Sequence, residues 1–384
     1  MGQAKVGLAY GCIALSLSGW GASAFAQSNV TLYGVLDTGV EYINHANASG
    51  GSVVRMPSNT GEFPSRWGMK GEEGLGGGYK AVFQVESGFT DGTGALGQGG
   101  RLFGRQAYVG IDGAPGAITF GRQYSMLYRA IFNADTLGPG IYGLASLDTW
   151  IGAPRSDNTV AWLRQFGPLT LGASYSFGRD ASPVGGSNTP GSGTCAGGSA
   201  GNNEACREWS AMASYDGALG GFAAGYDRQN GGEGAAANFF NGAMPVALSG
   251  SGNRDSRVSV DGYMNLGPVK VSAIWLNRHV ESATPAVSTI TSNQYVVEVG
   301  YRVNPALYID GLVQRAINKQ QDTRASMEVL RATYALSKQT FVYLQAALLQ
   351  NSAEAAYSAS GGGASTPGKG MNQFASMVGV RHMF

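Results

Sequence analysis

Apolar and polar residues alternate with a period of two in many segments of this chain. Between Leu169 and Phe177, every second residue is apolar, whereas the residues between them are threonine, glycine or serine. The same alternation recurs around residues 295–302, 307–314 and 342–348. A period of two is the pattern of a β-strand that has one apolar and one polar face. The sequence therefore predicts a protein built of amphipathic strands.

Sixteen candidate strands of this kind can be counted, and they are separated by two kinds of connection. Turns such as Gly167-Pro168 and Gly267-Pro268 alternate strictly with long polar connections such as residues 178–207, 229–255 and 352–370. Short turns at one end and long loops at the other are typical of outer-membrane barrels. We predict an all-β fold, a 16-stranded antiparallel transmembrane β-barrel. The candidate strands lie near residues 30–42, 64–71, 79–89, 102–111, 117–124, 159–166, 169–177, 208–215, 221–228, 256–265, 269–279, 293–302, 306–317, 325–335, 340–351 and 371–384.

A soluble β-sandwich is the alternative, because it too buries the apolar faces of alternating strands. Strand length favours the barrel, since about ten residues suffice to cross a bilayer when a strand is tilted. An even number of strands also allows closure, which removes the unpaired edges that lipid does not tolerate. The final segment, MNQFASMVGVRHMF, ends on Phe384, and we expect it to pair with the first strand.

The N-terminal segment has the pattern of an export signal. Lys5 precedes an apolar stretch from Leu8 to Trp20, and Ala24-Phe25-Ala26 matches the small-x-small cleavage pattern. A membrane helix is the alternative, but the apolar stretch is short and has no stop-transfer flank. We expect a cleaved signal peptide of residues 1–26 and a barrel domain of residues 27–384.

Composition and charge agree with an exported barrel. Glycine accounts for 61 of 384 residues, and 13% of residues are charged, about half the roughly 25% of soluble domains. Removing the signal peptide, whose single charge is Lys5, would leave 25 basic and 25 acidic side chains from the 26 and 25 of the whole chain. No basic patch of the kind that binds nucleic acid is visible, so we expect no nucleic-acid partner.

Two of the three cysteines are candidates for a disulfide. Cys12 lies in the predicted signal peptide, whereas Cys195 and Cys206 flank the polar segment AGGSAGNNEA. Two cysteines this close in an exported loop predict a disulfide bond, and two free thiols are the alternative. The three histidines are scattered, so the sequence predicts neither a metal site nor a cofactor.

Four motifs of this chain resemble the Gram-negative general porins, in particular the trimeric porins of neisserial and other β-proteobacterial type. They are VTLYGVLDTGVEY, SRWGMKGEEGLGGGYKAVFQVESGF, LFGRQAYVGIDGAPGAITFGRQY and VGVRHMF. The resemblance implies a homotrimer of sixteen-stranded barrels in the outer-membrane lipid. It also implies that the last residues, Phe384 among them, are an assembly signal read by the barrel-assembly machinery.

A barrel of sixteen strands leaves an aqueous channel, so a loop must fold inward to narrow it. The candidate is the segment of residues 125–157, which is longer than a hairpin loop and contains LGPGIYG. In the family this third loop lies against the inner wall and sets the size of the pore. Its acidic residues here are Asp135 and Asp148, and the alternative is a solvated outer loop.

Basic residues are expected on the wall that faces this loop. Alternation places Trp67 outward and therefore Arg66 and Lys70 toward the lumen. The resemblance makes Arg66 and Arg105 residues of the pore constriction, and Arg155 stands where the loop returns to the wall. A solvated charge at the rim is the alternative for each of them.

Charged rings along a narrow aqueous path select solutes by sign and by size. We therefore expect passive diffusion of ions and small hydrophilic solutes across the outer membrane, with a modest preference for anions. No pairing of a nucleophile with a base emerges, and GEEGLGGGY is interpreted as a turn rather than a phosphate loop, so we expect no enzyme. The alternatives are a lipid hydrolase built on a barrel and an adhesin or receptor whose long loops bind a partner.

Overall fold

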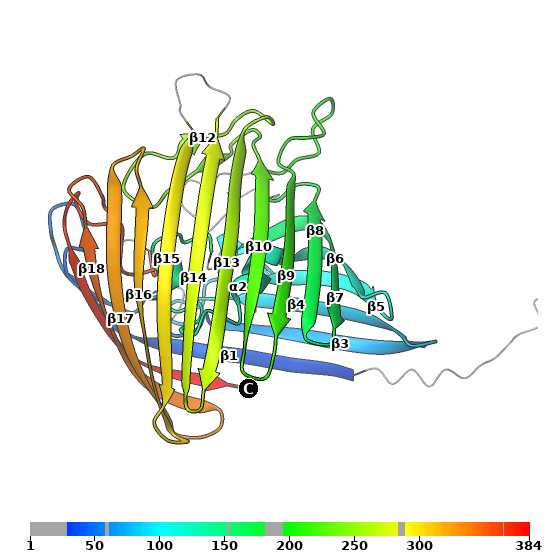
Figure 1. Ribbon diagram of the computed structural model, residues 1–384, viewed down its shortest axis with the longest axis horizontal. Coiled ribbons are helices and arrows are strands. Elements are labelled where there is room, and N and C mark those ends of the chain that lie inside the picture. Colours follow the sequence, from blue (N-terminus) through cyan, green and yellow to red (C-terminus); the bar gives the residue numbers. More distant parts are fainter. Residues whose placement is uncertain (1–28, 58–60, 152–153, 181–194, 283–288, 364) are drawn as a thin grey trace, which may run out of the picture.

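The computed structural model describes residues 29–57, 61–151, 154–180, 195–282, 289–363 and 365–384. The predicted signal peptide, residues 1–26, lies outside the described residues. Sixteen antiparallel strands form a closed barrel (Figure 1), with a three-residue strand, β2 (Val53–Arg55), added beside β1. The barrel strands are β1 (Asn29–Ile43), β3 (Arg66–Gly76), β4 (Tyr79–Gly88), β5 (Gln106–Asp112), β6 (Ala117–Tyr124), β7 (Arg155–Phe166), β8 (Leu169–Ser176), β9 (Glu208–Asp216), β10 (Gly220–Asn230), β13 (Arg254–Leu266), β14 (Val269–Glu281), β15 (Ile290–Arg302), β16 (Leu307–Asn318), β17 (Thr323–Ala335), β18 (Thr340–Asn351) and β19 (Gln373–Met383).

The first strand closes the barrel by pairing with strands from both ends of the chain. Its first half pairs with β3, from Asn29 opposite Glu72 to Val35 opposite Arg66. Its second half pairs with β19, ending at Ile43 opposite Ala375. Each of the sixteen candidate segments overlaps one barrel strand, so the predicted fold class is confirmed.

The connections differ from the prediction in two places. The connection from β16 to β17 lies among the long loops but has only residues 319–322, so the strict alternation of short and long connections is wrong there. The Asn318 side chain accepts a hydrogen bond from the Gln321 N–H (3.1 Å) and Asp322 has a positive φ, and these features permit a tight turn. In GEEGLGGGY, only Gly77 and Gly78 form the turn, because the preceding residues continue β3.

Side chains alternate across the barrel wall as the period of two requires. On β15, Tyr295, Val297 and Val299 are exposed on the outer surface, whereas Gln294 and Glu298 are buried on the inner side. Exposed aromatic residues lie near the short turns, such as Phe166 and Tyr301, and near the long loops, such as Trp209 and Phe374. Aromatic residues at both ends of the outer surface are the arrangement found at lipid interfaces. No helix among the described residues is long and apolar enough to cross a membrane.

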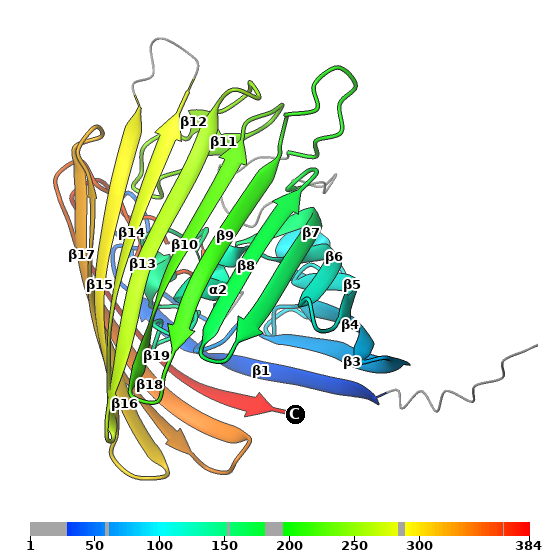
Figure 2. The same cartoon turned by 45° about the vertical axis from the view of Figure 1, so that its right-hand side comes forward.

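The remaining elements belong to the connections. They are two short helices, α1 (Gly97–Gly100) and α2 (Met126–Ile131), a 3-10 helix, η1 (Leu144–Ser146), and the two-stranded sheet of β11 (Ala236–Ala237) and β12 (Val246–Ala247). In Figure 2, α2 lies on the concave side of the sheet, whereas β11 and β12 lie at the end that carries the long loops.

The predicted disulfide between Cys195 and Cys206 is present, with the two Cα atoms 5.1 Å apart. Both cysteines are buried in a small apolar cluster with Phe239 and Leu248 from the connection between β10 and β13, and with Val280 from the end of β14. The disulfide therefore closes part of the connection between β8 and β9, and the packing around it attaches that loop to the next long loop.

Replacing both cysteines by serine is expected to loosen this loop without unfolding the barrel. A disulfide across so short a segment stabilises the folded loop by roughly 2–3 kcal/mol, because it restricts the unfolded ensemble, and this contribution is local. Trypsin should therefore cleave after Arg207 at least tenfold faster in the double variant, whereas the thermal midpoint of the barrel should stay within a few degrees. Equal cleavage of the oxidised protein and the double variant would contradict this role, and wild-type protein treated with reductant is the matched control.

Candidate functional site

The connection between β6 and β7, described for residues 125–151 and 154, crosses the interior of the barrel and is called the third loop below. Its first turn is α2, which begins after Ser125, whose hydroxyl accepts a hydrogen bond from the Tyr128 N–H. Leu127 and Ala130 on one face of α2 are buried against the inner wall at β9, β10 and β13. The inward fold of this loop is thus confirmed, although it ends at Pro154 because Arg155 already belongs to β7.

Wall side chains bind the backbone of the third loop. The Glu298 carboxylate on β15 accepts hydrogen bonds from the backbone N–H groups of Thr136 and Leu137, the latter at 3.1 Å. Arg331 on β17 donates to the Leu137 carbonyl at 3.0 Å and is itself held by Asp310 on β16 at 2.5 Å. These contacts satisfy backbone groups that would otherwise be buried without partners.

The middle of the loop is fixed further around the wall. The Tyr142 hydroxyl donates to Glu41 on β1 at 3.1 Å. The amide groups of Gln294 and Gln314 donate to the loop carbonyls of Leu144 and Gly143 at 2.9 and 2.8 Å, respectively.

Apolar packing completes the attachment of the loop. Ile141, Leu144 and Leu147 of the loop belong to one buried cluster with Leu312 and Met327 of the wall. Part of the inner wall is therefore apolar. The loop explains this, because it covers that part of the wall and keeps it out of the aqueous lumen.

Three predicted arginines meet at the ends of the neighbouring strands β3 to β7, and we call Arg66, Arg105 and Arg155 the basic cluster. Glu86 lies between two of them, with its carboxylate 3.5 Å from Arg66 Nε and 2.7 Å from Arg105 Nε. The Tyr124 hydroxyl accepts hydrogen bonds from Arg105 at 2.8 Å and from Arg155 at 2.5 Å. Antiparallel pairing aligns these strand ends, and this explains why residues far apart in sequence converge.

Lys70 lies on the inner face of β3 below the basic cluster and is exposed. Its Nζ is 5.6 Å from the centre of the Tyr33 ring, and the Tyr33 hydroxyl donates to Glu86 at 2.9 Å. Arg66 and Arg105 thus pair with Glu86, whereas Arg155 contacts Tyr124 and Lys70 lies over Tyr33. Among the described residues, these four positive charges therefore outnumber the one carboxylate that pairs with them.

Among the described residues, neither of the two predicted acidic residues forms an ion pair with the basic cluster. Asp135 is on the third loop, where it accepts a hydrogen bond from the Gly138 N–H at 2.9 Å, and burial raises the pKa of its carboxyl to about 6. Asp148 pairs with Arg257 at 3.1 Å and lies 3.9 Å from Arg278, with only 6% of its surface exposed. Asp148 is therefore neutralised by the far wall and does not oppose the basic cluster as a free charge.

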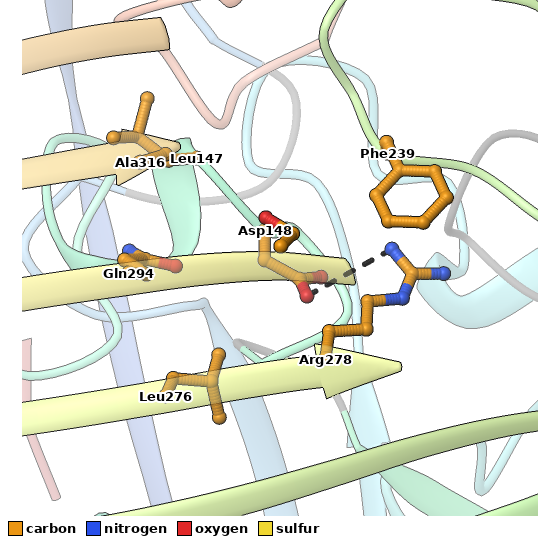
Figure 3. A pocket seen from close by; sticks show the side chains of 8 residues that line it. Leu147, Asp148, Phe239, Leu276, Arg278, Gln294 and Ala316 are labelled. Carbon is orange, nitrogen blue, oxygen red and sulfur yellow. Dashed lines mark ion pairs between the residues drawn. The ribbon is translucent and has the colours of Figure 1, made fainter. Parts of the chain in front are cut away.

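Figure 3 shows Asp148 and Arg278 side by side in a small pocket beneath Phe239. The Arg278 guanidinium lies 4.5 Å from the centre of the Phe239 ring and binds Asp255 at 2.8 Å. Leu276 and Ala316 line the same pocket from the wall. Because its charged groups satisfy one another, this pocket attaches the end of the third loop to the wall.

The sequence did not reveal the residues that hold the loop. Glu298 and Gln294 were recognisable only as inward-facing residues of a strand, and their partners are backbone groups more than 140 residues away. Tyr124 carried a weak signal, since it ends the motif GRQY directly before the loop. Among the described residues, no group of three His, Cys, Asp or Glu side chains is arranged to hold a metal ion.

A closed barrel with a loop folded into its interior and a charged inner wall defines the class of the porins. Residues 11–354 match the family model described as Gram-negative porin, so the chain belongs to that family. The chain is 37% identical over 177 residues to an outer membrane porin protein of Bordetella pertussis, a match that covers 42% of this chain and 46% of the relative. It is 32% identical over 175 residues to outer membrane porin protein 32 of Delftia acidovorans, covering 43% and 48%, respectively. These matches span just under half the length of each relative.

Solved structures agree on the fold. An anion-selective porin from Comamonas acidovorans superposes with a TM-score of 0.73 at 22% identity, covering 93% of this chain and 100% of that one. The outer membrane protein OmpT of Vibrio cholerae superposes with a TM-score of 0.65 at 14% identity, covering 93% and 98%. At these identities the likeness concerns the fold alone.

Proposed function

We propose that this protein is a general diffusion porin of the Gram-negative outer membrane. It lets ions and small hydrophilic solutes pass passively, and it assembles as a homotrimer in the lipid. The observation that carries this proposal is the third loop, fastened by Glu298, Arg331 and Gln314 to one wall while a basic cluster lines another. A barrel serving only as an adhesin anchor, or as a support for a hydrolase, has no need of such a constriction.

The constriction is proposed to prefer anions modestly. Arg66, Arg105, Arg155 and Lys70 form its positive side, and Glu86 offsets one of these charges. Asp135 is the acidic residue left on the loop, since Asp148 is paired with Arg257. Because the Asp135 carboxyl loses its charge as the pH falls through about 6, anion preference should rise at acid pH.

Liposome swelling tests the diffusion function directly. Liposomes that contain the purified protein should swell in isotonic arabinose or glucose and more slowly as the solute becomes larger. Swelling no faster than that of protein-free liposomes, for every solute, would contradict a general diffusion channel. Liposomes that contain heat-denatured protein are the control for leakage caused by the protein preparation.

Export and assembly are part of the proposal. Residues 1–26 would be removed as a signal peptide, and the segment ending at Phe384 would be read by the barrel-assembly machinery. The structure supplies a physical reason for the second statement. The backbone N–H of Phe384 donates to the Gly34 carbonyl at 3.1 Å, and the Gly34 N–H donates to the Phe384 carbonyl at 2.9 Å, which extends the pairing that closes the barrel.

Deleting Phe384 is expected to prevent assembly, because both hydrogen bonds and the ring are lost where β19 meets β1. Most of the variant should accumulate as unfolded chain, with at least a tenfold loss of heat-modifiable trimer on semi-native electrophoresis. Phe384→Tyr keeps the ring and the backbone and should assemble normally. Wild-type amounts of trimer from the deletion variant would contradict the role given to Phe384.

A further inference from the structure

Three aromatic residues follow one another at intervals of four along the start of the third loop. Tyr124, the last residue of β6, stacks on Tyr128 of α2, with ring centres 4.3 Å apart and planes 11° apart. Tyr128 contacts Phe132, directly after α2, with a centre-to-centre distance of 6.3 Å. Each ring contacts the next, so the three rings form one continuous row. We call them the aromatic row.

The aromatic row faces the lumen. The opposite side of α2, with Leu127 and Ala130, is buried against the wall, so Tyr128 and Phe132 must point away from it. Phe132 is 63% exposed, and it is the only large apolar side chain exposed among the described residues of the third loop. A phenyl ring exposed to water forgoes the favourable free energy of burial. A solute that contacts the ring would recover part of that free energy, and this favours a role for Phe132 in binding solutes.

The Tyr124 end of the row lies inside the basic cluster. The Arg155 guanidinium is 4.3 Å from the centre of the Tyr124 ring, and both Arg155 and Arg105 donate to its hydroxyl. Arg129 follows Tyr128 on α2 and is partly exposed. The row therefore has an exposed ring, that of Phe132, at one end and the positive charge of the basic cluster, in which Arg66 is 20% exposed, at the other.

This combination determines the chemistry of a ligand. An aromatic ring stacks on other rings, and a carboxylate forms charge-assisted hydrogen bonds with guanidinium groups. An aromatic cation would be repelled by the basic cluster. A neutral sugar could stack on the rings but would make no use of the positive charge of the basic cluster that Glu86 leaves uncompensated. We propose that the aromatic row and the basic cluster together form a binding subsite for small planar aromatic carboxylates. This inference rests on the proposed channel function.

Two anions of equal charge and similar size separate stacking from simple anion passage. Benzoate and cyclohexanecarboxylate are added to the trimer in planar bilayers, and the concentration of each that halves the chloride current is measured. Because an aromatic contact favours the planar ring, benzoate should act at about fivefold lower concentration. Phe132→Leu should reduce that ratio to less than twofold, and Phe132→Tyr, which keeps a ring, should preserve it.

Phe120→Leu is the matched control, since Phe120 is exposed on the outer face of β6, four residues before Tyr124. It should leave the ratio at the wild-type value. Equal action of the two anions on the wild type, or a ratio that Phe132→Leu does not change, would overturn the subsite while leaving the channel intact. Stronger block by maltose than by benzoate would also overturn it, in favour of a sugar site. If no current appears at all, the proposed channel function fails and this inference fails with it.

Discussion

Replacing Arg66 by glutamate is expected to turn an anion-preferring channel into one that prefers cations. Arg66 keeps 20% of its side chain exposed, so its charge acts directly on ions in the lumen. A unit charge about 5 Å from a passing ion changes the energy of that ion by roughly 1 kcal/mol even in water. Reversing the charge makes the interaction energy less favourable for chloride and more favourable for potassium. The ratio of chloride to potassium permeability should therefore fall about tenfold or more.

Reversal potentials under a potassium chloride gradient measure this ratio. Arg66→Gln should give about half the shift, and it avoids placing a second carboxylate beside Glu86. Lys369→Glu makes the same change of charge in an exposed loop, where Lys369 pairs with Glu354, and should leave the potential almost unchanged. If Arg66→Glu and Lys369→Glu shift the potential equally, the basic cluster does not line the constriction.

Arg105 is a poorer choice for this test, although the sequence made it appear equivalent to Arg66. It is only 4% exposed and is held between Glu86 and Tyr124. A glutamate there would bring two buried carboxylates together and disturb folding.

Replacing Glu298 by alanine is expected to release the third loop from the wall. The backbone N–H groups of Thr136 and Leu137 would lose their acceptor in a buried place, which costs about 1–3 kcal/mol per group. A loop that undocks more than about tenfold more often should produce frequent current fluctuations within the open state. Single-channel noise at constant voltage measures this effect.

Asp261→Ala provides the control for the release of the loop. Asp261 lies on the inner side of β13, and among the described residues it holds no backbone group of the third loop. Its replacement should leave the noise at the wild-type level. Glu298→Gln retains one acceptor oxygen and should give an intermediate level. A quiet Glu298→Ala channel would show that the other wall contacts suffice to hold the loop.

The strands could be predicted from the sequence because a barrel wall imposes its own local rule. Each residue of β15 faces either lipid or the interior, so apolar and polar residues alternate with a period of two in its sequence. The disulfide was predictable for a similar reason, since Cys195 and Cys206 are close along the chain. The four-residue turn at 319–322 was not, because it depends on one side chain, that of Asn318.

The arrangement of the residues proposed to form the constriction was only partly predictable. Arg66, Arg105 and Arg155 converge because antiparallel pairing aligns the ends of β3, β5 and β7, which a strand count can anticipate. The role of Asp148 depends on Arg257 and Arg278, which are more than 100 residues away on the opposite wall. No pattern along the chain reveals which carboxylate such arginines neutralise.

Single-channel recording of the wild-type trimer in planar bilayers tests the central claim most directly. We predict stepwise increases in conductance as trimers insert. Under a potassium chloride gradient, the reversal potential should lie on the chloride side of zero and move toward zero as the salt concentration rises, because salt screens the basic cluster. Correctly folded trimers that insert without conductance steps, or steps with a firm preference for potassium, would contradict the account.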